Sequence, residues 1–377
     1  MSVPFNWSLL LLQAWRSIFA TRGTHRRLTP HRLKVLIIFW TLFLPHQLVT
    51  RFCLILDNIF FPAWRREPIK KPVFITGVFR SGTTYLHRMM ASDNSTFSAF
   101  KTWEIYVAPS IVQRKLIRLL MRLDALIGKP IYSLLSRYDS KKLRSIRFHH
   151  VGLWKEEEDE GLFLFSWDSL FTWFFFPDSR GMNDYWDRGG KGNRRRMEFF
   201  RNCVRRHLFF HGDRAIYLSK NPAFSPMLAS LKEVFPDARV IYLLRTPMEA
   251  LPSQAVWLSF CWHYFSSPTE KYPFKTELLE MSSIWYSHPL KLFDSWQSQE
   301  YLVIKYAKLI ESPSEVMEKI YRHFELSMSE DFRNQLQEKT EGENRHSAGT
   351  TLEEVGYDRE QVIRIFAELC RRYDLTL

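Results

Sequence analysis

Short apolar runs alternate with amphipathic stretches along most of this chain. Four runs have the length and composition of buried strands: Pro72–Thr76, Arg214–Leu218, Arg239–Leu244 and Tyr301–Lys305. Apolar residues at helical spacing follow the first run at Thr84–Met90 and separate the second from the third at Phe224–Phe235. Strands that alternate with helices predict an α/β fold, here a three-layer sandwich with a central parallel sheet covered by helices.

Two regions lie outside this alternation. Residues 115–210 are mainly helical in pattern and indicate an insertion within a domain that spans 57–377. Residues 1–56 form a separate basic and apolar extension, which we expect to be helical. Asp57–Lys71 connects the two, because Pro62 and Pro68 break any regular element there.

The amino-terminal extension leaves two interpretations open. Its apolar stretches, Leu9–Leu12 and Val35–Leu44, flank a basic stretch at Arg22–Lys34. The uncharged segment from Val35 to Thr50 is shorter than the roughly 20 residues that span a bilayer. A secretory signal is not indicated, since no small-residue cleavage site follows an apolar core. The extension either packs on the domain as helices or lies on an anionic membrane surface, and a true membrane span is a third, disfavoured option.

Charge is concentrated at the amino terminus. Of the net charge of +13, the first 71 residues contribute +9, which leaves +4 for the other 306. A nucleic-acid-binding surface on the folded domain is therefore not expected. The four cysteines are widely separated and are expected to be buried free thiols in a reducing compartment. These features predict a cytoplasmic protein, with peripheral attachment to the cytoplasmic face of the membrane as the alternative.

The first strand leads into a glycine-rich loop, Gly77–Thr84, that has the spacing of a phosphate-binding loop. Gly77 and Gly82 allow a tight turn whose backbone N–H groups face an anion at the start of a helix. In nucleotide triphosphatases a lysine follows the second glycine and reaches the β and γ phosphates, but here Thr83 occupies that position. Ordinary ATP or GTP hydrolysis is therefore disfavoured, and Arg80 is the candidate cation of the loop.

At this point the residues resemble a known family. Phe79-Arg80-Ser81-Gly82-Thr83-Thr84 is similar to the signature with which sulfotransferases bind 3′-phosphoadenosine 5′-phosphosulfate (PAPS). The similarity is greatest to the bacterial branch related to tyrosylprotein and heparan-type enzymes. Further elements follow in the family's order, from about Asp57 to the carboxyl end: Thr102-Trp103-Glu104, Ser219-Lys220-Asn221-Pro222, and Arg245-Thr246-Pro247 with Ser253 eight residues after Arg245.

The resemblance implies a donor site in two parts. Ser81, Gly82, Thr83 and Thr84 would hold the 5′-phosphosulfate through backbone groups and hydroxyls, together with Arg80. Arg245 and Ser253 would hold the 3′-phosphate, for which the fork of an arginine is well suited. PAPS would be the co-substrate, and no metal would be required.

The same resemblance implies three catalytic residues. Glu104 would be the general base that removes the proton of the acceptor. Lys220 and Arg80 would stabilise the charge that develops on the bridging and sulfuryl oxygens. The family commonly has Asn-Lys-Asp-Pro around this lysine, whereas Ser219 and Asn221 flank it here. Relatives that use a histidine base make four histidines rivals of Glu104: His87, His149, His150 and His211.

Two further features have simpler interpretations. The acidic run Glu156–Glu160 is expected to be a solvated helix face or a capping network, because charge runs usually face water. The aromatic run Trp167–Phe176 is expected in the core, with the wall of an apolar acceptor cavity as the alternative.

The function that these observations predict is direct in-line transfer of a sulfuryl group from PAPS to an acceptor hydroxyl, with an amine as the second choice. The acceptor is not identified by the sequence, and the extension suggests a lipid alongside a glycan. Two alternatives remain open. One is a nucleotide kinase or phosphotransferase on the same P-loop scaffold, and the other is a noncatalytic membrane-surface module with a degenerate loop.

Overall fold

A central sheet of five parallel strands organises the protein, in the order β2-β3-β1-β4-β5. The computed structural model describes residues 4–139, 152–178, 191–212, 215–339 and 349–376. The strands are β1 (Val73–Gly77), β2 (Phe97–Ser98), β3 (Ile216–Lys220), β4 (Arg239–Leu244) and β5 (Tyr301–Lys305). The four predicted strands are present, with β3 two residues later than expected. The two-residue β2 was too short to be recognised from its pattern.

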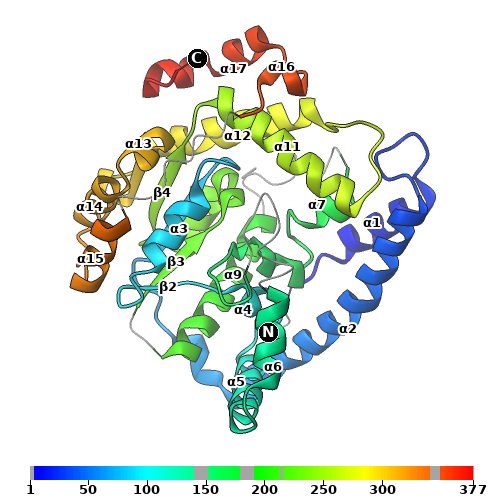
Figure 1. The fold of residues 1–377 in the computed structure, drawn as a ribbon, viewed down its shortest axis with the longest axis vertical. Helices are drawn as coiled ribbons and strands as arrows, with labels where there is room; N and C mark the ends of the chain where they lie inside the picture. Colours follow the sequence, from blue (N-terminus) through cyan, green and yellow to red (C-terminus); the bar gives the residue numbers. More distant parts are fainter. Residues whose placement is uncertain (1–3, 140–151, 179–190, 213–214, 340–348, 377) are drawn as a thin grey trace.

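Helices cover both faces of the sheet, which confirms the predicted three-layer α/β fold (Figure 1). Alternate strand residues point to opposite faces, so Val73 and Ile75 belong to one apolar core and Phe74 to the other. One face packs against α3 (Thr83–Ala91), α13 (Tyr306–Glu311), α14 (Pro313–His323) and α15 (Glu330–Lys339). The other packs against α9 (Lys191–His211), α10 (Leu228–Val234), α11 (Pro247–Phe265), α12 (Lys275–Phe293) and α17 (Arg359–Tyr373).

The described residues between β2 and β3 are mainly helical, as the pattern of residues 115–210 predicted. It comprises α4 (Thr102–Tyr106), α5 (Ile111–Leu126), α6 (Pro130–Tyr138), the 3-10 helix η3 (Asp159–Phe165) and α7 (Thr172–Phe175), followed by α9. The helix expected at Phe224–Phe235 is divided into the 3-10 helix η4 (Pro222–Met227) and α10. Pro226 accounts for the division, since it lacks the N–H that a continuous α-helix requires.

The amino-terminal extension forms two helices, α1 (Trp7–Phe19) and α2 (Pro30–Phe60), which pack on the domain. The guanidinium of Arg32 is fully buried and donates to the carbonyl of Phe175 and the hydroxyl of Ser266. Arg26 donates to the carbonyl of Pro177. Much of the basic stretch between the apolar segments therefore attaches the extension to the domain.

The helix α2 is much longer than the apolar segment that predicted it, because Arg51 and Asp57 turn inward. Arg51 donates to the carbonyl of Phe165, and the carboxylate of Asp57 accepts from the backbone of α5. None of the exposed residues between positions 35 and 60 is charged. By length and composition alone, α2 is long and apolar enough to cross a membrane.

The four cysteines are free thiols; Cys203, Cys261 and Cys370 are buried, and Cys53 is half-buried. Burial raises the pKa of Cys203 to about 11 and that of Cys261 to about 12. Both are therefore protonated and unreactive at neutral pH.

Candidate active site

The residues singled out in the sequence meet at one edge of the sheet. β1, β3 and β4 are adjacent and parallel, and they end at Gly77, Lys220 and Leu244. β1 is central, and the chain passes to β2 and β3 on one side and to β4 and β5 on the other. The strand order therefore reverses direction beside β1. Parallel α/β sheets bind ligands beyond the carboxyl ends of their strands, next to the point where the strand order reverses.

The loop after β1 requires both of its glycines. Gly77 and Gly82 have φ angles of +150° and +88°, which residues other than glycine rarely adopt. A Cβ at Gly77 would lie 2.5 Å from the carbonyl oxygen of Leu243, and one at Gly82 would lie 2.8 Å from the ring of Tyr306. The hydroxyl of Ser81 donates to the carbonyl of Val78 and closes the turn. The loop thus directs its backbone toward the start of α3.

The two predicted parts of the donor site are in direct contact. Nε of Arg80 donates to the hydroxyl of Ser253 at 3.2 Å, and Nη1 of Arg245 donates to the carbonyl of Arg80 at 2.8 Å. The guanidinium of Arg245 also lies over the ring of Tyr306, 4.5 Å from its centre, and this ring contacts Gly82. Burial and the cation of Arg245 lower the pKa of Arg80. A bound bisphosphate would offset the repulsion between the two guanidiniums.

A cavity of about 620 Å³ opens beside this loop. The loop and the sheet edge contribute Arg80, Thr83, Thr84 and Lys220 to its wall. Most of the remaining wall is apolar or aromatic: Phe39, Phe79, Tyr106, Tyr138, Leu153, Leu164, Phe171, Phe174, Phe175, Pro222, Trp257 and Phe265. Part of the aromatic run Trp167–Phe176 therefore lines a cavity, the alternative we left open for it. The volume is within the range of small-molecule sites.

Lys220 lies in the wall of this cavity beside two carboxylates. Its ammonium group is 2.7 Å from Oε2 of Glu158 and 3.7 Å from Oε1 of Glu157, and its side chain is 1% exposed. Burial opposes the charge of Lys220, but the carboxylates, Glu158 first, raise the pKa of the lysine above its ordinary value. Oε1 of Glu158 is buried and makes no hydrogen bond with any residue that the structure describes. Both Glu157 and Glu158 line the cavity.

The acidic run is therefore not the solvated helix face that its charge suggested. The carboxylate of Asp159 accepts from the hydroxyls of Tyr217 and Ser219 and from the backbone N–H of Lys220. Glu160 accepts from the side chain of Asn221. Burial raises the pKa of Asp159 to about 6 and that of Glu160 to about 8. Together these carboxylates fix the end of β3, and with it the position of Lys220.

Glu104 lies in a different environment from the one its predicted role requires. It is fully buried, and it does not line the cavity although its neighbours Thr102 and Tyr106 do. Its carboxylate accepts from the ring of His211 at 2.8 Å and lies 3.8 Å from both Arg114 and His207. Burial alone would raise the pKa of Glu104, but Arg114 and the histidines hold it well below its usual range. These contacts join α4, α5 and α9, and they do not favour Glu104 as a general base.

The same cluster has the spacing of a metal site. Ligand atoms of Glu104, His207 and His211 lie within 4.8 Å of one another. The guanidinium of Arg114 already faces that carboxylate, however, and a divalent cation there would meet a buried positive charge. We attribute the cluster to ion pairing, and the prediction that the reaction requires no metal remains a prediction.

The rival histidines are not better placed. His87 is buried in α3, where burial and the charge of Lys220 lower its pKa to about 3. His211 is engaged by Glu104. His149 and His150 lie outside the described residues.

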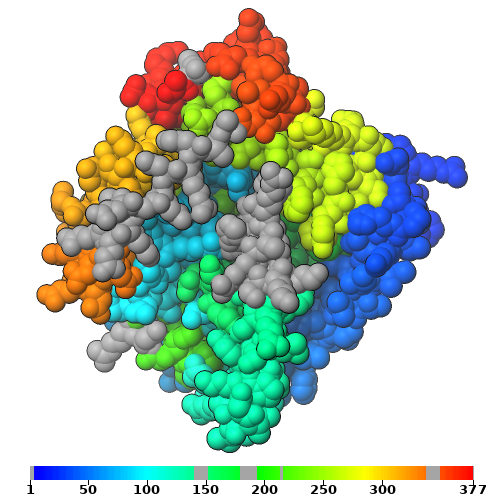
Figure 2. Space-filling view, in the orientation of Figure 1, coloured from blue at the N-terminus to red at the C-terminus, as the bar shows by residue number. Residues whose placement is uncertain are grey.

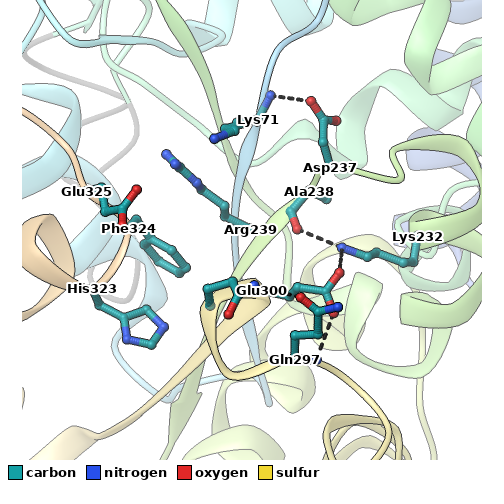
Figure 3. Close-up of a pocket in the computed structure, with 11 residues that line it drawn as sticks. Lys71, Lys232, Asp237, Ala238, Arg239, Gln297, Glu300, His323, Phe324 and Glu325 are labelled. Atoms are coloured by element: carbon teal, nitrogen blue, oxygen red, sulfur yellow. Dashed lines mark hydrogen bonds and ion pairs between the residues drawn. The ribbon is translucent and has the colours of Figure 1, made fainter.

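A second cavity, of about 540 Å³, lies at the opposite edge of the sheet (Figure 3). Figure 3 shows that charged side chains of both signs surround it, next to the start of β4 at Arg239. Several of them are paired with one another: Lys232 binds Glu300 at 2.7 Å, and the backbone of Lys71 donates to Asp237. This cavity is at the amino ends of the strands, remote from the loop, and we assign it no catalytic role.

Comparison with known proteins agrees with this arrangement. The sequence profile of the Sulfotransferase family matches residues 72–330. The chain belongs to the sulfotransferase family. This sulfotransferase is similar in structure to sulfotransferase STF9 from Mycobacterium avium, with a TM-score of 0.74 and 18% identity over 100% of this chain and 98% of that one. It is also similar to STF1 from Mycobacterium tuberculosis H37Rv, with a TM-score of 0.66 and 19% identity over 97% and 99% of the two chains. A search of curated proteins gives no significant match.

Proposed function

We propose that this sulfotransferase transfers a sulfuryl group from PAPS to an acceptor hydroxyl. The observation that supports the proposal most strongly is the shared cavity. Arg80, Thr83 and Thr84 of the loop line it together with Lys220, and most of the rest of its wall is apolar. An anionic donor at the loop and an acceptor in the apolar part would then present their reacting atoms beside Lys220.

The anion-binding groups match a nucleotide with phosphates at two positions. The loop has Thr83 where a triphosphatase has lysine, so it lacks the side chain that holds β and γ phosphates. Arg80 and Arg245 supply two guanidiniums: that of Arg80 donates to the hydroxyl of Ser253 in α11, and that of Arg245 donates to the carbonyl of Arg80. A 5′-phosphosulfate at the loop and a 3′-phosphate at Arg245 and Ser253 would use all of these groups.

We further propose that Glu158, in place of Glu104, receives the proton of the acceptor. Glu158 lines the cavity and its Oε2 contacts the ammonium of Lys220, while its Oε1 accepts no hydrogen bond from the described residues. A carboxylate in this position can accept a hydrogen bond from a hydroxyl as that oxygen approaches sulfur. Glu104 instead has its oxygens directed to Arg114 and His211.

The reaction then balances without a covalent enzyme intermediate. The acceptor oxygen forms a bond to sulfur while the bond between sulfur and the bridging phosphate oxygen breaks. The acceptor proton passes to Glu158, and the electron pair of the broken bond stays on the departing adenosine 3′,5′-bisphosphate (PAP). Lys220 and Arg80 stabilise the negative charge on the bridging and sulfuryl oxygens, where positioned cations are most effective.

Incubation of the purified chain with ³⁵S-labelled PAPS tests this function. The acceptors are fractions of a cell extract separated into lipid, glycan, peptide and small-molecule pools. Label that moves from PAPS into one pool, and not with heat-denatured chain, supports the proposal. If PAP stabilises the chain but no pool accepts label, the chain binds the nucleotide without performing the transfer.

A further inference from the structure

We infer that this sulfotransferase rests on an anionic lipid bilayer through α2 and the α5–α6 hairpin, and that its acceptor is a hydroxyl-bearing amphiphile taken from that bilayer. The inference depends on the proposed function for its chemistry, but the membrane contact can be measured separately. Three observations support it: the lining of the cavity, the elements that form its wall, and the charge of the surface around it.

The cavity offers an acceptor little besides apolar surface. Beyond the end that holds Arg80, Lys220 and the two glutamates, its wall is mainly formed by the aromatic and aliphatic side chains given above. A glycan brings many hydroxyl groups, and each one buried against such a wall would lose its hydrogen bonds to water without replacement. An alkyl or polyprenyl chain gains free energy from the same burial. The lining therefore selects an apolar acceptor with its hydroxyl at one end.

Three elements contribute both to the cavity wall and to an exposed apolar surface. Phe39 of α2, Tyr138 of α6 and Phe265 of α11 line the cavity. Tyr138 is 55% exposed, and Tyr264, the neighbour of Phe265, is 61% exposed. The apolar lining thus continues onto the outside of the protein, which gives a lipid-soluble acceptor a route that avoids water.

The outward face of α2 is apolar over most of the helix. Every exposed residue from Ile37 to Phe60 is uncharged, and Leu42 and Leu48 are 67% and 69% exposed. The other apolar residues exposed on this face are Ile37, Ile38, Leu44, Val49, Phe52, Ile55, Ile59 and Phe60. At 1.5 Å per residue this stretch is roughly 36 Å long. An apolar surface of this length is too large for the solvent-facing side of an ordinary soluble protein.

The α5–α6 hairpin adds apolar residues and positive charge. Its exposed apolar residues are Leu116, Leu119, Leu120, Leu123, Leu126, Ile127, Ile131, Tyr132, Leu134 and Tyr138. Its exposed charged residues are all basic: Lys115, Arg118, Arg122, Lys129 and Arg137. The acidic residue between 111 and 138 is Asp124, which is buried and accepts from the backbone at the start of α6. Exposed basic and apolar groups on the same hairpin match the headgroups and acyl chains of an anionic bilayer, at about 1 kcal/mol per cation.

The two surfaces are neighbours, so one bilayer can contact both. The carboxylate of Asp57 in α2 accepts from the backbone of Ile111 and Val112 at the start of α5. Figure 2 shows the extension, in blue, along one side of the molecule and the α5–α6 hairpin, in blue-green, at the adjoining end. A second copy of the chain is a poorer partner, because a symmetric contact through the hairpin would bring like charges together.

The helix α2 would lie along the bilayer and not across it. Its inward face is fixed to the protein by the buried side chains of Arg32, Gln47, Thr50 and Asp57. Insertion across a membrane would break these bonds and expose two ionised groups to hydrocarbon.

Sedimentation with vesicles tests the membrane contact independently of catalysis. The purified chain is mixed with phosphatidylcholine vesicles and with vesicles that also contain phosphatidylglycerol. We expect strong, salt-sensitive binding to the second kind, and at least a ten-fold weaker affinity for the double variant Leu119→Glu/Leu123→Glu. The control is Ile365→Glu, because Ile365 is an exposed apolar residue of α17, at the opposite end of the molecule (Figure 1). Equal affinity of the double variant and the control, or self-association that replaces vesicle binding, overturns the membrane contact.

Labelled PAPS tests the acceptor class. Hexadecan-1-ol in the phosphatidylglycerol vesicles is the apolar probe, and glucose and a tyrosine-containing peptide are soluble comparators. We expect label in the vesicle phase at a rate at least ten-fold above either comparator. Two results overturn the inference and leave donor binding intact. One is label in glucose or the peptide in place of the lipid. The other is the absence of label in the lipid when PAP stabilises the chain against heat. A chain that PAP does not stabilise instead contradicts the proposed function.

Discussion

The ammonium group of Lys220 and the carboxylate of Glu158 lie 2.7 Å apart at the point where β3 ends. Both side chains line the cavity beside the loop Gly77–Thr84. This pair relates the donor side to the acceptor side: the lysine can stabilise the leaving group, and the glutamate can receive a proton.

The first prediction concerns this pair. Glu158→Gln removes the proton acceptor but keeps the size of the side chain. We expect kcat to fall roughly 10²- to 10⁴-fold, with PAP binding within about five-fold of the original. Rates from labelled PAPS and affinities from calorimetry measure the two quantities separately.

Glu104→Gln is the matched variant for the rival base. It leaves the buried guanidinium of Arg114 without its carboxylate, so we expect a loss of roughly 3–5 kcal/mol in the free energy of unfolding. Folded protein that remains should retain turnover. If Glu104→Gln is stable but inactive, and Glu158→Gln is active, then Glu104 is the base.

The second prediction concerns the 3′-phosphate. Arg245→Ala removes a guanidinium fork, and we expect the affinity for PAP to fall about ten- to a hundred-fold. The affinity for adenosine 5′-phosphosulfate, which has no 3′-phosphate, should change much less. Glu249→Gln is the control, since it removes the exposed ion-pair partner of Arg245 at 3.0 Å and should alter the affinity by less than about five-fold. An equal loss of affinity for both nucleotides would mean that Arg245 supports the conformation of the loop and does not bind the 3′-phosphate.

The third prediction separates backbone strain from steric contact in the loop. Gly82 and Gly128 both have a φ of +88°, but a Cβ at Gly128 would meet nothing within 4 Å. Gly128→Ala should therefore cost about 1 kcal/mol of unfolding free energy from the backbone alone. Gly82→Ala should cost about 1–3 kcal/mol more, because its Cβ would overlap the ring of Tyr306. Denaturant titration of the two variants measures the difference, and equal costs would show that the loop moves away from Tyr306 freely.

The fourth prediction concerns pH. The folded-state pKa of His87 is about 3, below its unfolded value of about 6.5, so the unfolded chain binds the proton first as pH falls. The contribution of neutral His87 to stability is present above pH 6.5 and is lost toward pH 3. Between pH 7 and pH 5 this loss amounts to about 2 kcal/mol. His87→Leu should reduce the difference in unfolding free energy between pH 7 and pH 5 by that amount. Denaturant titrations at the two pH values measure this difference, which does not depend on how stable the variant is at pH 7. An unchanged difference between the two pH values would mean that His87 is protonated in the folded chain.

Much of the fold was predictable from the sequence because it depends on local pattern. The buried strands are short and apolar, and two of the positive-φ positions of the loop are the glycines Gly77 and Gly82. The length of α2 was underestimated because Arg51 and Asp57 interrupt its apolar run in sequence. In the helix these residues face the protein, while Phe52 and Ile55 between them face outward.

The acceptor side of the site was less accessible from the sequence. A run of five acidic residues usually faces water, and only β3 and Lys220, about 60 positions later, show why Glu157, Asp159 and Glu160 are buried here. The environment of Glu104 likewise depends on His207 and His211 of α9, about 100 positions away. Both depend on tertiary contacts that have no local signal. The sequence offered one hint that a carboxylate would be buried here. Tyr217 and Ser219 are two residues apart in β3, so their hydroxyls lie on the same face of the strand, where both donate to Asp159.

Thermal unfolding with PAP is the most direct measurement of the central claim, that the loop and the Arg245–Ser253 pair bind one nucleotide together. At a hundred times its dissociation constant, PAP should stabilise the folded chain by about 2.7 kcal/mol and raise the unfolding temperature. ADP and adenosine 5′-phosphosulfate, which lack the 3′-phosphate, should raise it less at the same concentration. No rise with PAP, or an equal rise with all three nucleotides, would contradict the account.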